Sequence, residues 1–425
     1  MKVIKYTYKF RLKPTNDQKI LLNKHFGSVR WTYNYFLNQR KEEYLNNKKS
    51  ITYNKQSEYL TQLKKNEETE WLKEINSQTL QYSLKCLDTA YSGFFAGRSK
   101  LPKFKSRKNR NSFTVPQFVS VNKNKLFIPK FREMGIEIIM NRKIKGTIKH
   151  CSISKTSTGK YFVSILTEQE HQPTTKSNQS AGIDLGIKDF LVLSNGTKIK
   201  NHRFLKHYER TLALNQKHLS KKTKGSNRYE KQRLKVAKIH EKITNSRMDL
   251  IHKTTNNLIR NFDVIYLEDL NIKGMSKRCK SKQDKNGKYL PNNQSAKSGL
   301  NKSILDVSWG KFIEVLEYKA SWNDKQVIHI NRFFPSSKAC SKCGCINNNL
   351  ALKDRTWICP KCGSVHDRDV NAAINILNEG YRKNISDGTS DYERGAKINP
   401  KKLGISHETL KEREPSVPET TTSLV

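Results

Sequence analysis

Residues 181–186 read Ala-Gly-Ile-Asp-Leu-Gly, an apolar segment that a single acid, Asp184, interrupts. A short apolar run between turn signals predicts a buried strand, and a buried carboxylate costs free energy unless a cation compensates it. A second apolar run, 263–267, ends directly before Glu268, and a third acid, Asp369, opens the last expected helix. We therefore predict an α/β core in which three acids, distant in sequence, share a pair of divalent ions.

Each of the three acids also has an ordinary structural explanation. Asp369 could be a helix N-cap, and Glu268 could pair with a lysine of the long basic helical region that precedes it. Asp184 is the hardest to explain without a metal, and the strand context favours the metal hypothesis for all three. Hard oxygen ligands favour Mg²⁺ or Mn²⁺. The strand pleat places Asp269 on the opposite face from Glu268, whereas spacing alone does not separate Asp367 from Asp369.

Five of the eight cysteines cluster near the C-terminal end, which predicts a metal site. Cys340-x-x-Cys343 and Cys359-x-x-Cys362 are two knuckles, and together they supply the four thiolates that a tetrahedral Zn²⁺ prefers. Cys345 could replace Cys343, but the longer spacing would break the knuckle. Because protein ligands fill the shell, we expect a structural zinc.

The charge of the chain predicts a polyanionic partner. Lys and Arg number 81 against 38 Asp and Glu, a formal net charge of +43, and release of counter-ions from phosphates would compensate for this excess. An anionic membrane surface is the other candidate. The sequence contains no apolar run of about 18 residues, the length needed to cross a bilayer. We expect a cytoplasmic, nucleoid-associated protein with no membrane partner. Five cations of a basic loop are candidate nucleic-acid contacts: Lys103, Lys105, Arg107, Lys108 and Arg110.

Hydrophobic periodicity and turn residues predict the remaining elements. We expect a strand over 6–12, a capping box at Thr15 and Gln18, and two helices, the second starting at Ser77. We expect further strands at 125–128, 136–139, 151–154, 161–166, 190–194 and 327–330, with helices over 202–260 and 303–320. Segments 167–179 and 276–299 lack periodicity and are expected to be a linker and a mobile basic loop, and the residues from about 379 are expected to be a polar, disordered tail.

The sequence resembles the TnpB family, which insertion sequences encode and which is related to type V CRISPR effectors. The resemblance extends over nearly the whole chain to about residue 380. It rests on these segments: YKFRL at 8–12, PT at 14–15, FG at 26–27, PKFKS at 102–106, GIDLG at 182–186, LEDLNIKGM at 267–275, PSS at 335–337 and DRD with NAA at 367–373.

The resemblance implies a multidomain α/β fold. An RNase H-like (RuvC) nuclease core would comprise 180–333 and 364–380, with a zinc ribbon inserted at 334–363. A β-barrel-like, oligonucleotide-binding (wedge) domain would comprise 1–13 and 100–170, with a helical bundle (recognition domain) inserted at 14–99. Residues 381–425 would form the tail.

The resemblance also implies an activity. The three RuvC acids map to Asp184, Glu268 and Asp369, which selects Asp369 over Asp367. The family's activity would be RNA-guided cleavage of double-stranded DNA beside a short transposon-associated motif, with two Mg²⁺ ions and a guide RNA from the transposon's own end. The loop 276–299 is one candidate for a lid over the site. Two rivals remain at this point: a transposase that transfers DNA strands, and a non-catalytic zinc-ribbon regulator of transposition.

Overall fold

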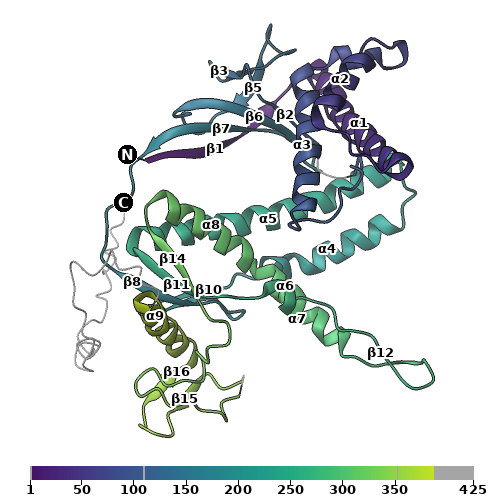
Figure 1. Cartoon of the computed structure of the whole chain (residues 1–425). Helices are drawn as coiled ribbons and strands as arrows, with labels where there is room; N and C mark the ends of the chain where they lie inside the picture. The colour runs from purple at the N-terminus through teal and green to yellow at the C-terminus, as the bar shows by residue number, and fades with distance from the viewer. Residues whose placement is uncertain (1, 109–110, 352, 387–425) are drawn as a thin grey trace, which may run out of the picture.

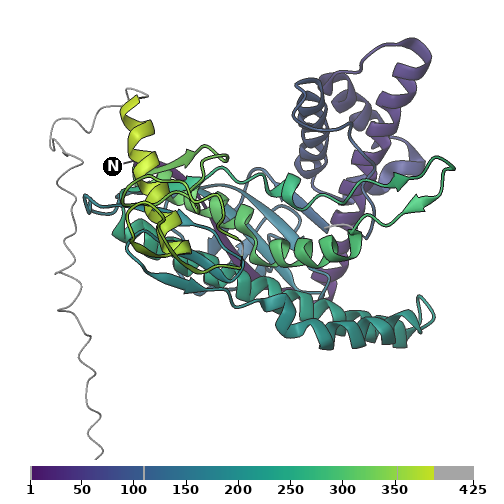
Figure 2. The same cartoon turned by 90° about the horizontal axis from the view of Figure 1, so that it is seen from below.

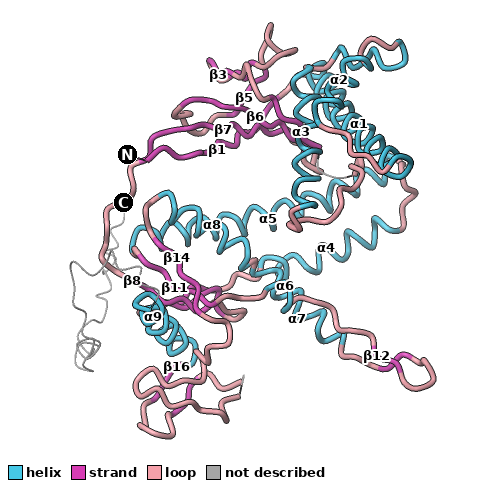
Figure 3. The backbone as a smooth tube through the Cα atoms, viewed as in Figure 1, coloured by secondary structure: helices cyan, strands magenta, loops and turns pink. Residues whose placement is uncertain are grey.

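Two β-sheets organise the molecule, one in each half of the chain (Figure 1). The structure is a computed structural model, and it describes residues 2–108, 111–351 and 353–386. Figure 2 shows the same arrangement from below, and Figure 3 separates helices from strands by colour.

The first sheet is antiparallel and has seven strands in the order β2-β6-β7-β1-β5-β4-β3. Its strands are β1 (Lys2–Lys13), β2 (Asn111–Val115), β3 (Ser120–Asn122), β4 (Lys125–Phe127), β5 (Ile136–Ile139), β6 (Thr147–Lys155) and β7 (Tyr161–His171). β1 lies in the middle and pairs with β7 along its whole length, from Leu12 with Tyr161 to Lys2 with His171. The expectation that the linker begins at 167 is therefore wrong, because backbone pairing with β1 extends β7 through a polar segment.

All the helices of the first half lie between β1 and β2 in the chain: α1 (Asn16–Asn47), α2 (Tyr53–Leu63), the 3₁₀ helix η1 (Glu67–Glu74) and α3 (Ser77–Phe95). The predicted capping box is confirmed at the start of α1, where Thr15 and Gln18 each bond the other's backbone N–H. The apolar faces of α1 and α3 join the core of the first sheet through Leu22, Phe26, Phe36, Leu80 and Leu84.

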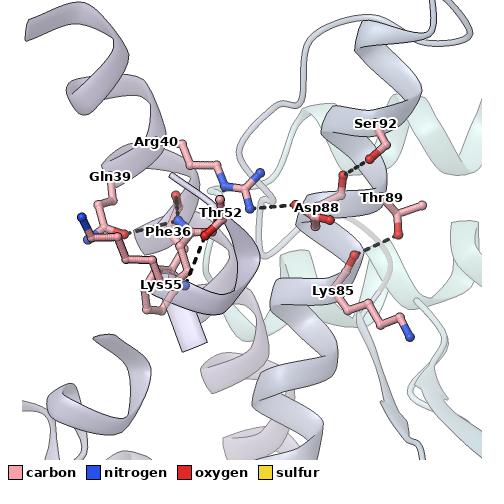
Figure 4. Close-up of polar contacts among 10 residues, drawn as sticks. Phe36, Gln39, Arg40, Thr52, Lys55, Lys85, Asp88, Thr89 and Ser92 are labelled. Atoms are coloured by element: carbon pink, nitrogen blue, oxygen red, sulfur yellow. Dashed lines mark hydrogen bonds and ion pairs between the residues drawn. The ribbon is translucent and has the colours of Figure 1, made fainter. Parts of the chain in front are cut away.

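A polar network centred on the buried side chains of Arg40 and Gln56 connects three of these helices (Figure 4). Arg40 on α1 donates through Nε to Gln56 of α2 at 2.8 Å and through Nη2 to Asp88 of α3 at 3.0 Å. The Gln56 amide in turn donates to the Phe36 carbonyl at 3.0 Å. Because buried polar groups cost free energy when unpaired, this network specifies how the three helices pack.

The second sheet is mixed and has five strands in the order β10-β9-β8-β11-β14. They are β8 (Ser180–Asp184), β9 (Asp189–Leu193), β10 (Lys198–Lys200), β11 (Val264–Glu268) and β14 (Gln326–Ile330). β8, β11 and β14 run parallel, while β9 and β10 are antiparallel to their neighbours. The helices of this half are α4 (Phe204–Ser220), α5 (Asn227–Asn261), α6 (Ile272–Met275), α7 (Gln294–Val307), α8 (Trp309–Trp322) and α9 (Arg368–Ser386). α9 packs on one face of the sheet, α5 and α8 contribute to the core on the other face, and α4 packs along α5.

Three expectations for this half need correction. The helix expected over 303–320 is two helices, because Ser308 adopts a left-handed conformation (φ 61°) between α7 and α8. The segment 276–299 is structured in part: β12 (Lys282–Gln283) and β13 (Tyr289–Leu290) form a small hairpin, and α7 begins at Gln294. Figure 3 shows this arm projecting from the body. Residues 381–386 belong to α9 and not to a tail, and 387–425 lie outside the described residues.

The two halves contact each other directly. The Lys2 ammonium pairs with Asp324 at 2.7 Å, and Lys160 pairs with Glu241 of α5 at 3.0 Å. Across the described part of the chain, no helix combines the length and apolar character needed to span a lipid bilayer.

Candidate active site and zinc ribbon

Asp184 and Glu268 lie side by side at the ends of two neighbouring parallel strands. Ile183 of β8 is paired with Leu267 of β11, so the next residues, Asp184 and Glu268, are at the same level. Adjacent strands are about 4.8 Å apart, and residues at matching positions share a face of the sheet. The two carboxylates therefore point to the same side, as the sequence prediction requires.

That side is the one that α9 covers. Gly182 and Tyr266 precede the two acids by two residues, so they share the same face. A Cβ on Gly182 would lie 2.1 Å from the carbonyl oxygen of Ala373, and one on Gly380 would lie 2.0 Å from the Tyr266 ring. α9 thus packs directly on β8 and β11. The intervening residues, such as Ile183 and Leu267, face the opposite core beneath α5 and α8.

The first turn of α9 separates the roles of Asp367 and Asp369. Asp367 Oδ1 accepts hydrogen bonds at 3.1 Å from the backbone N–H groups of Asp369 and Val370, so Asp367 is the N-cap. Asp367 also pairs with Lys198 at 2.6 Å. Asp369 has no capping role, and its carboxylate contacts Arg355 at 3.2 and 3.3 Å. Asp269, which follows Glu268 directly after β11, pairs with Arg332 and not with a residue of α9.

The electrostatics of the three acids indicate a site for cations. Burial, together with the negative charges of Glu268 and Asp369, raises the pKa of Asp184 to about 7, although the positive charges of Arg368 and Arg355 oppose this shift. Burial also raises the pKa of Glu268, against a hydrogen bond that its carboxylate accepts from Ser336. Bound divalent cations would favour the charged form of such carboxylates.

The carboxylate oxygens of the three acids nevertheless lie farther apart than the ligand atoms around a single metal ion. Among the described residues, only the four cysteines place three or more ligand atoms within 4.8 Å of one another. Like charges repel in the absence of a cation, and Arg355 holds Asp369. A two-ion site also spreads its ligands, since the ions lie about 3.5–4 Å apart. The shared use of these acids by metal ions remains a prediction.

Three polar residues that the sequence analysis missed position the site. The buried amides of Asn371 and Asn375 on α9 donate to the Ala339 carbonyl at 2.7 and 2.6 Å, and Asn375 also donates to the Ser336 carbonyl at 2.7 Å. Ser336 Oγ donates to Glu268. A sequence pattern could have revealed the two asparagines. They lie four residues apart and interrupt the apolar stripe of a helix, where asparagine is unfavourable without a partner.

The four predicted cysteines converge next to this site. Sγ of Cys343 lies 3.5 Å from that of Cys359, and Sγ of Cys340 lies 3.7 Å from that of Cys362. Tetrahedral Zn–S bonds of about 2.3 Å imply S···S distances of roughly 3.8 Å, so this shell fits zinc. Cys345 is outside this group and accepts the Cys340 N–H through its carbonyl.

Two further features shape the cysteine cluster. Hydrogen bonds from Ser364 lower the pKa of the Cys362 thiol to about 6, which favours the thiolate, and His366 Nε2 lies 3.0 Å from Cys340 Sγ. The ribbon hairpin pairs β15 (Thr356–Ile358) with β16 (Val365–Asp367). It therefore continues past residue 363, the expected end of the ribbon, and leads straight into α9 and Asp369.

The candidate contacts of the basic loop differ in what their side chains touch. Lys103, Lys105, Arg107 and Lys108 are all exposed as whole residues. The Lys105 ammonium lies 3.8 Å from the centre of the Tyr33 ring, and burial lowers its pKa. Asn34 also bonds the Lys105 backbone in both directions, at 2.7 and 2.9 Å. Lys105 thus anchors the loop to α1, and Arg110 lies outside the described residues.

The fold, the three acids and the four cysteines together define the class of protein. It is a strongly basic α/β protein with a four-cysteine ribbon directly before the helix that carries Asp369. Three family models match parts of the chain: a "Probable transposase" model (OrfB of IS605) over 164–279, a Cas12f1-like TNB domain over 309–376 and a helix-turn-helix domain over 1–49. The segment that the helix-turn-helix model matches forms a strand, β1, and one long helix, α1, in this structure.

Two curated relatives match over almost their full length. One from Streptomyces pristinaespiralis, named "Putative RNA-guided DNA endonuclease", is 36% identical over 89% of this chain and 90% of its own. One from Escherichia coli K12, named "Putative RNA-guided DNA endonuclease InsQ", is 34% identical over 88% of this chain and 92% of its own. The chain belongs to the TnpB family of transposon-encoded proteins, which confirms the resemblance.

A solved complex of Cas12f1 with guide RNA and target DNA covers 88% of this chain and 98% of its own. Its TM-score is 0.49 at 14% identity, a similarity too low to establish the fold by itself.

Proposed function

We propose that this protein is an RNA-guided, divalent-metal-dependent endonuclease of a transposable element, which cuts double-stranded DNA beside a short transposon-associated motif. The observation that supports this most strongly is the placement of Asp184 and Glu268 at the same level of adjacent strands, on the face covered by the helix that carries Asp369. The full-length relatives, whose printed names contain "RNA-guided DNA endonuclease", support the guided activity.

The second half of the chain would be the RuvC-type nuclease core. Its mixed sheet carries two acids at strand ends and receives the third from a helix, an arrangement suited to holding a pair of ions. The donor set consists of carboxylate oxygens with raised pKa values at Asp184 and Glu268, and it therefore fits Mg²⁺ or Mn²⁺. When bound, such ions supply Lewis-acid activation of water and stabilise the leaving oxygen of a phosphodiester.

The protein's own residues would perform three tasks. Asp184, Glu268 and Asp369 would hold the ions, and Arg355, which contacts Asp369, would lie where it can pair with a phosphate once the acid binds metal. The cysteine ribbon would hold a structural Zn²⁺ and fix the start of α9. The first sheet and its helices would bind a guide RNA from the transposon end and its duplex with DNA through phosphate contacts, among them Lys103, Arg107 and Lys108. Base pairing would then read the sequence.

Copurification followed by a cleavage assay tests the proposal. The full chain, expressed with its transposon end, should retain a discrete RNA, and the complex should cut a plasmid that carries the matching target in Mg²⁺. A strand transferase would instead bind transposon-end DNA without RNA and join strands, and a non-catalytic regulator would bind DNA without cutting it. Absence of both a discrete RNA and cutting would contradict the proposal.

A further inference from the structure

Two cavities adjoin on the surface where α1 meets η1 and the basic loop. The first has a volume of about 730 Å³, and three aromatic residues, Trp31, Tyr35 and Trp71, line it. The second has a volume of about 320 Å³, and three cations, Arg30, Arg107 and Lys155, line it. Gly27 and Arg30 line both cavities, so an aromatic slot and a cationic slot share a wall.

The aromatic slot presents rings in a fixed arrangement. Trp31 and Tyr35, one helical turn apart on α1, stack with ring centres 4.9 Å apart, and Trp71 meets Trp31 edge-on at 5.3 Å. Tyr35 and Trp71 remain 40% and 39% exposed. Large aromatic residues that lie open beside cations are typical of platforms on which unpaired bases stack. The one carboxylate of this slot, Glu74, is paired with Lys24 at 2.6 Å.

The cationic slot suits a phosphate. Carboxylates are missing from its lining, and within the described residues Arg30, Arg107 and Lys155 form no ion pair. Arg30 donates a long 3.4 Å bond to Asn111, and Lys155 donates to Asn23 at 3.1 Å. The shared wall is open, because a Cβ on Gly27 would meet nothing within 4 Å. A chain of phosphates could therefore pass the cationic slot while one base enters the aromatic slot.

We propose that these two cavities together bind one unpaired nucleotide of the nucleic acid that the protein carries. Its base stacks on the Tyr35, Trp31 and Trp71 rings, and its flanking phosphates pair with Arg30, Arg107 and Lys155. A paired base is excluded, because its faces are covered by its neighbours in the helix. This inference rests on the proposed nucleic-acid function and adds a single-stranded subsite, distant in sequence from the acids.

Binding of short single strands by the full chain tests the subsite. The probes are labelled oligothymidylate and oligouridylate of about 12 nucleotides, a usual site size, and a DNA duplex of the same length. Tyr35→Ala should weaken binding of the single strands by about fivefold or more, the usual effect of removing one stacking ring, and Tyr35→Phe should restore it. The matched control is Tyr44→Ala, since Tyr44 is 60% exposed on the same helix and lines neither cavity.

The two single strands distinguish an RNA source of the nucleotide from a DNA source. Duplex binding should be the same for all Tyr35 variants. Equal weakening by Tyr35→Ala and Tyr44→Ala, or equal loss for duplex and single strands, would overturn the subsite.

A second variant does not depend on the stability of the bundle. Arg107 is exposed, so Arg107→Ala should fold normally. It should reduce the slope of log affinity against log salt by about one for the single strands. A thiouridine-bearing probe should also cross-link to a peptide within residues 24–35 under ultraviolet light. Cross-links that avoid this segment, together with an unchanged slope, would refute the subsite. RNA copurification and plasmid cutting by the wild-type chain test the proposed function independently. If both succeed while the subsite variants bind like wild type, only the subsite is refuted.

Discussion

Gly182→Ala should damage both stability and cleavage, because β8 and α9 touch at this residue. The new Cβ would lie 2.1 Å from the Ala373 carbonyl oxygen and 2.6 Å from the Leu377 nitrogen. Both atoms are backbone, so no side-chain rotation relieves the contact, and α9 must move by at least about 1.3 Å to reach ordinary van der Waals separation. Overpacking of this kind typically costs about 1–3 kcal/mol.

The same movement would displace the catalytic candidate. Asp369 precedes Ala373 by one helical turn, about 6 Å along the axis, so a shift of α9 moves its carboxylate with it. A displacement of about 1 Å at a reacting centre can reduce a rate by about 100-fold. We therefore expect the free energy of unfolding in urea to fall by about 1–3 kcal/mol and the cleavage rate by up to about 100-fold, with zinc content unchanged.

Two other glycines provide the controls. Gly310→Ala on α8 adds a methyl that meets the tip of the Ile272 side chain at 3.4 Å, an ordinary contact, so stability and cleavage should stay near wild type. Gly380→Ala clashes with Tyr266 at the far end of α9, and it should cost stability with a smaller loss of cleavage. If Gly182→Ala matches Gly310→Ala in both assays, the close approach of α9 to β8 is not what positions Asp369.

Three further predictions concern a cap, the zinc and a buried ion pair. Asp367→Asn should retain most of the cleavage because asparagine also caps helices, whereas Asp369→Asn should abolish it; equal losses in a plasmid assay would return the choice to Asp367. Cys359→Ser, or prolonged chelation, should remove zinc and lower the folded fraction, and a metal analysis with normal folding and no zinc would refute the ribbon. Asp263→Ala should destabilise the protein by about 3–5 kcal/mol in urea, because it leaves the Lys325 ammonium buried without its partner at 3.1 Å; a loss below about 1 kcal/mol would contradict a buried pair.

Acid pH should weaken the same ion pair. Burial favours the neutral form of Asp263, but backbone N–H groups of Ser177 and Asn178 and the Lys325 ammonium outweigh it, so the pKa is lowered. A carboxylate with a lowered folded-state pKa contributes stability above its unfolded pKa of about 3.9 and loses it as the pH falls through the folded value. Urea titrations of wild type and Asp263→Asn should therefore converge in strong acid, and parallel curves would contradict this.

The sequence predicted the positions of two acids on the sheet. An acid inside an apolar strand and an acid after the next buried strand placed Asp184 and Glu268 at strand ends, because strand ends and pleat parity are local properties, and the structure has them at the same level of adjacent strands. Their role as metal ligands stays a prediction. The paired cysteine knuckles likewise predicted the sulfur cluster. The choice between Asp367 and Asp369 depended instead on which carboxylate meets the backbone N–H groups of the first turn, and spacing carries no such information.

Long-range pairing explains the other differences. β7 extends to His171 only because β1 supplies hydrogen bonds to a polar segment. The break at Ser308 is a single left-handed residue in a sequence whose apolar periodicity runs on. Asn371 and Asn375 are buried only because the ribbon segment before Cys340 presents its carbonyls to them. Each of these features depends on a partner that is distant in sequence.

Plasmid cleavage by the Asp184→Ala complex tests the central claim most directly. The variant should copurify with the same RNA as wild type, bind the matching target and leave the plasmid uncut in Mg²⁺, because its ion-holding carboxylate is gone while the nucleic-acid-binding surface is intact. Cutting at the wild-type rate would show that the carboxylates at the ends of β8 and β11 do not form the nuclease centre.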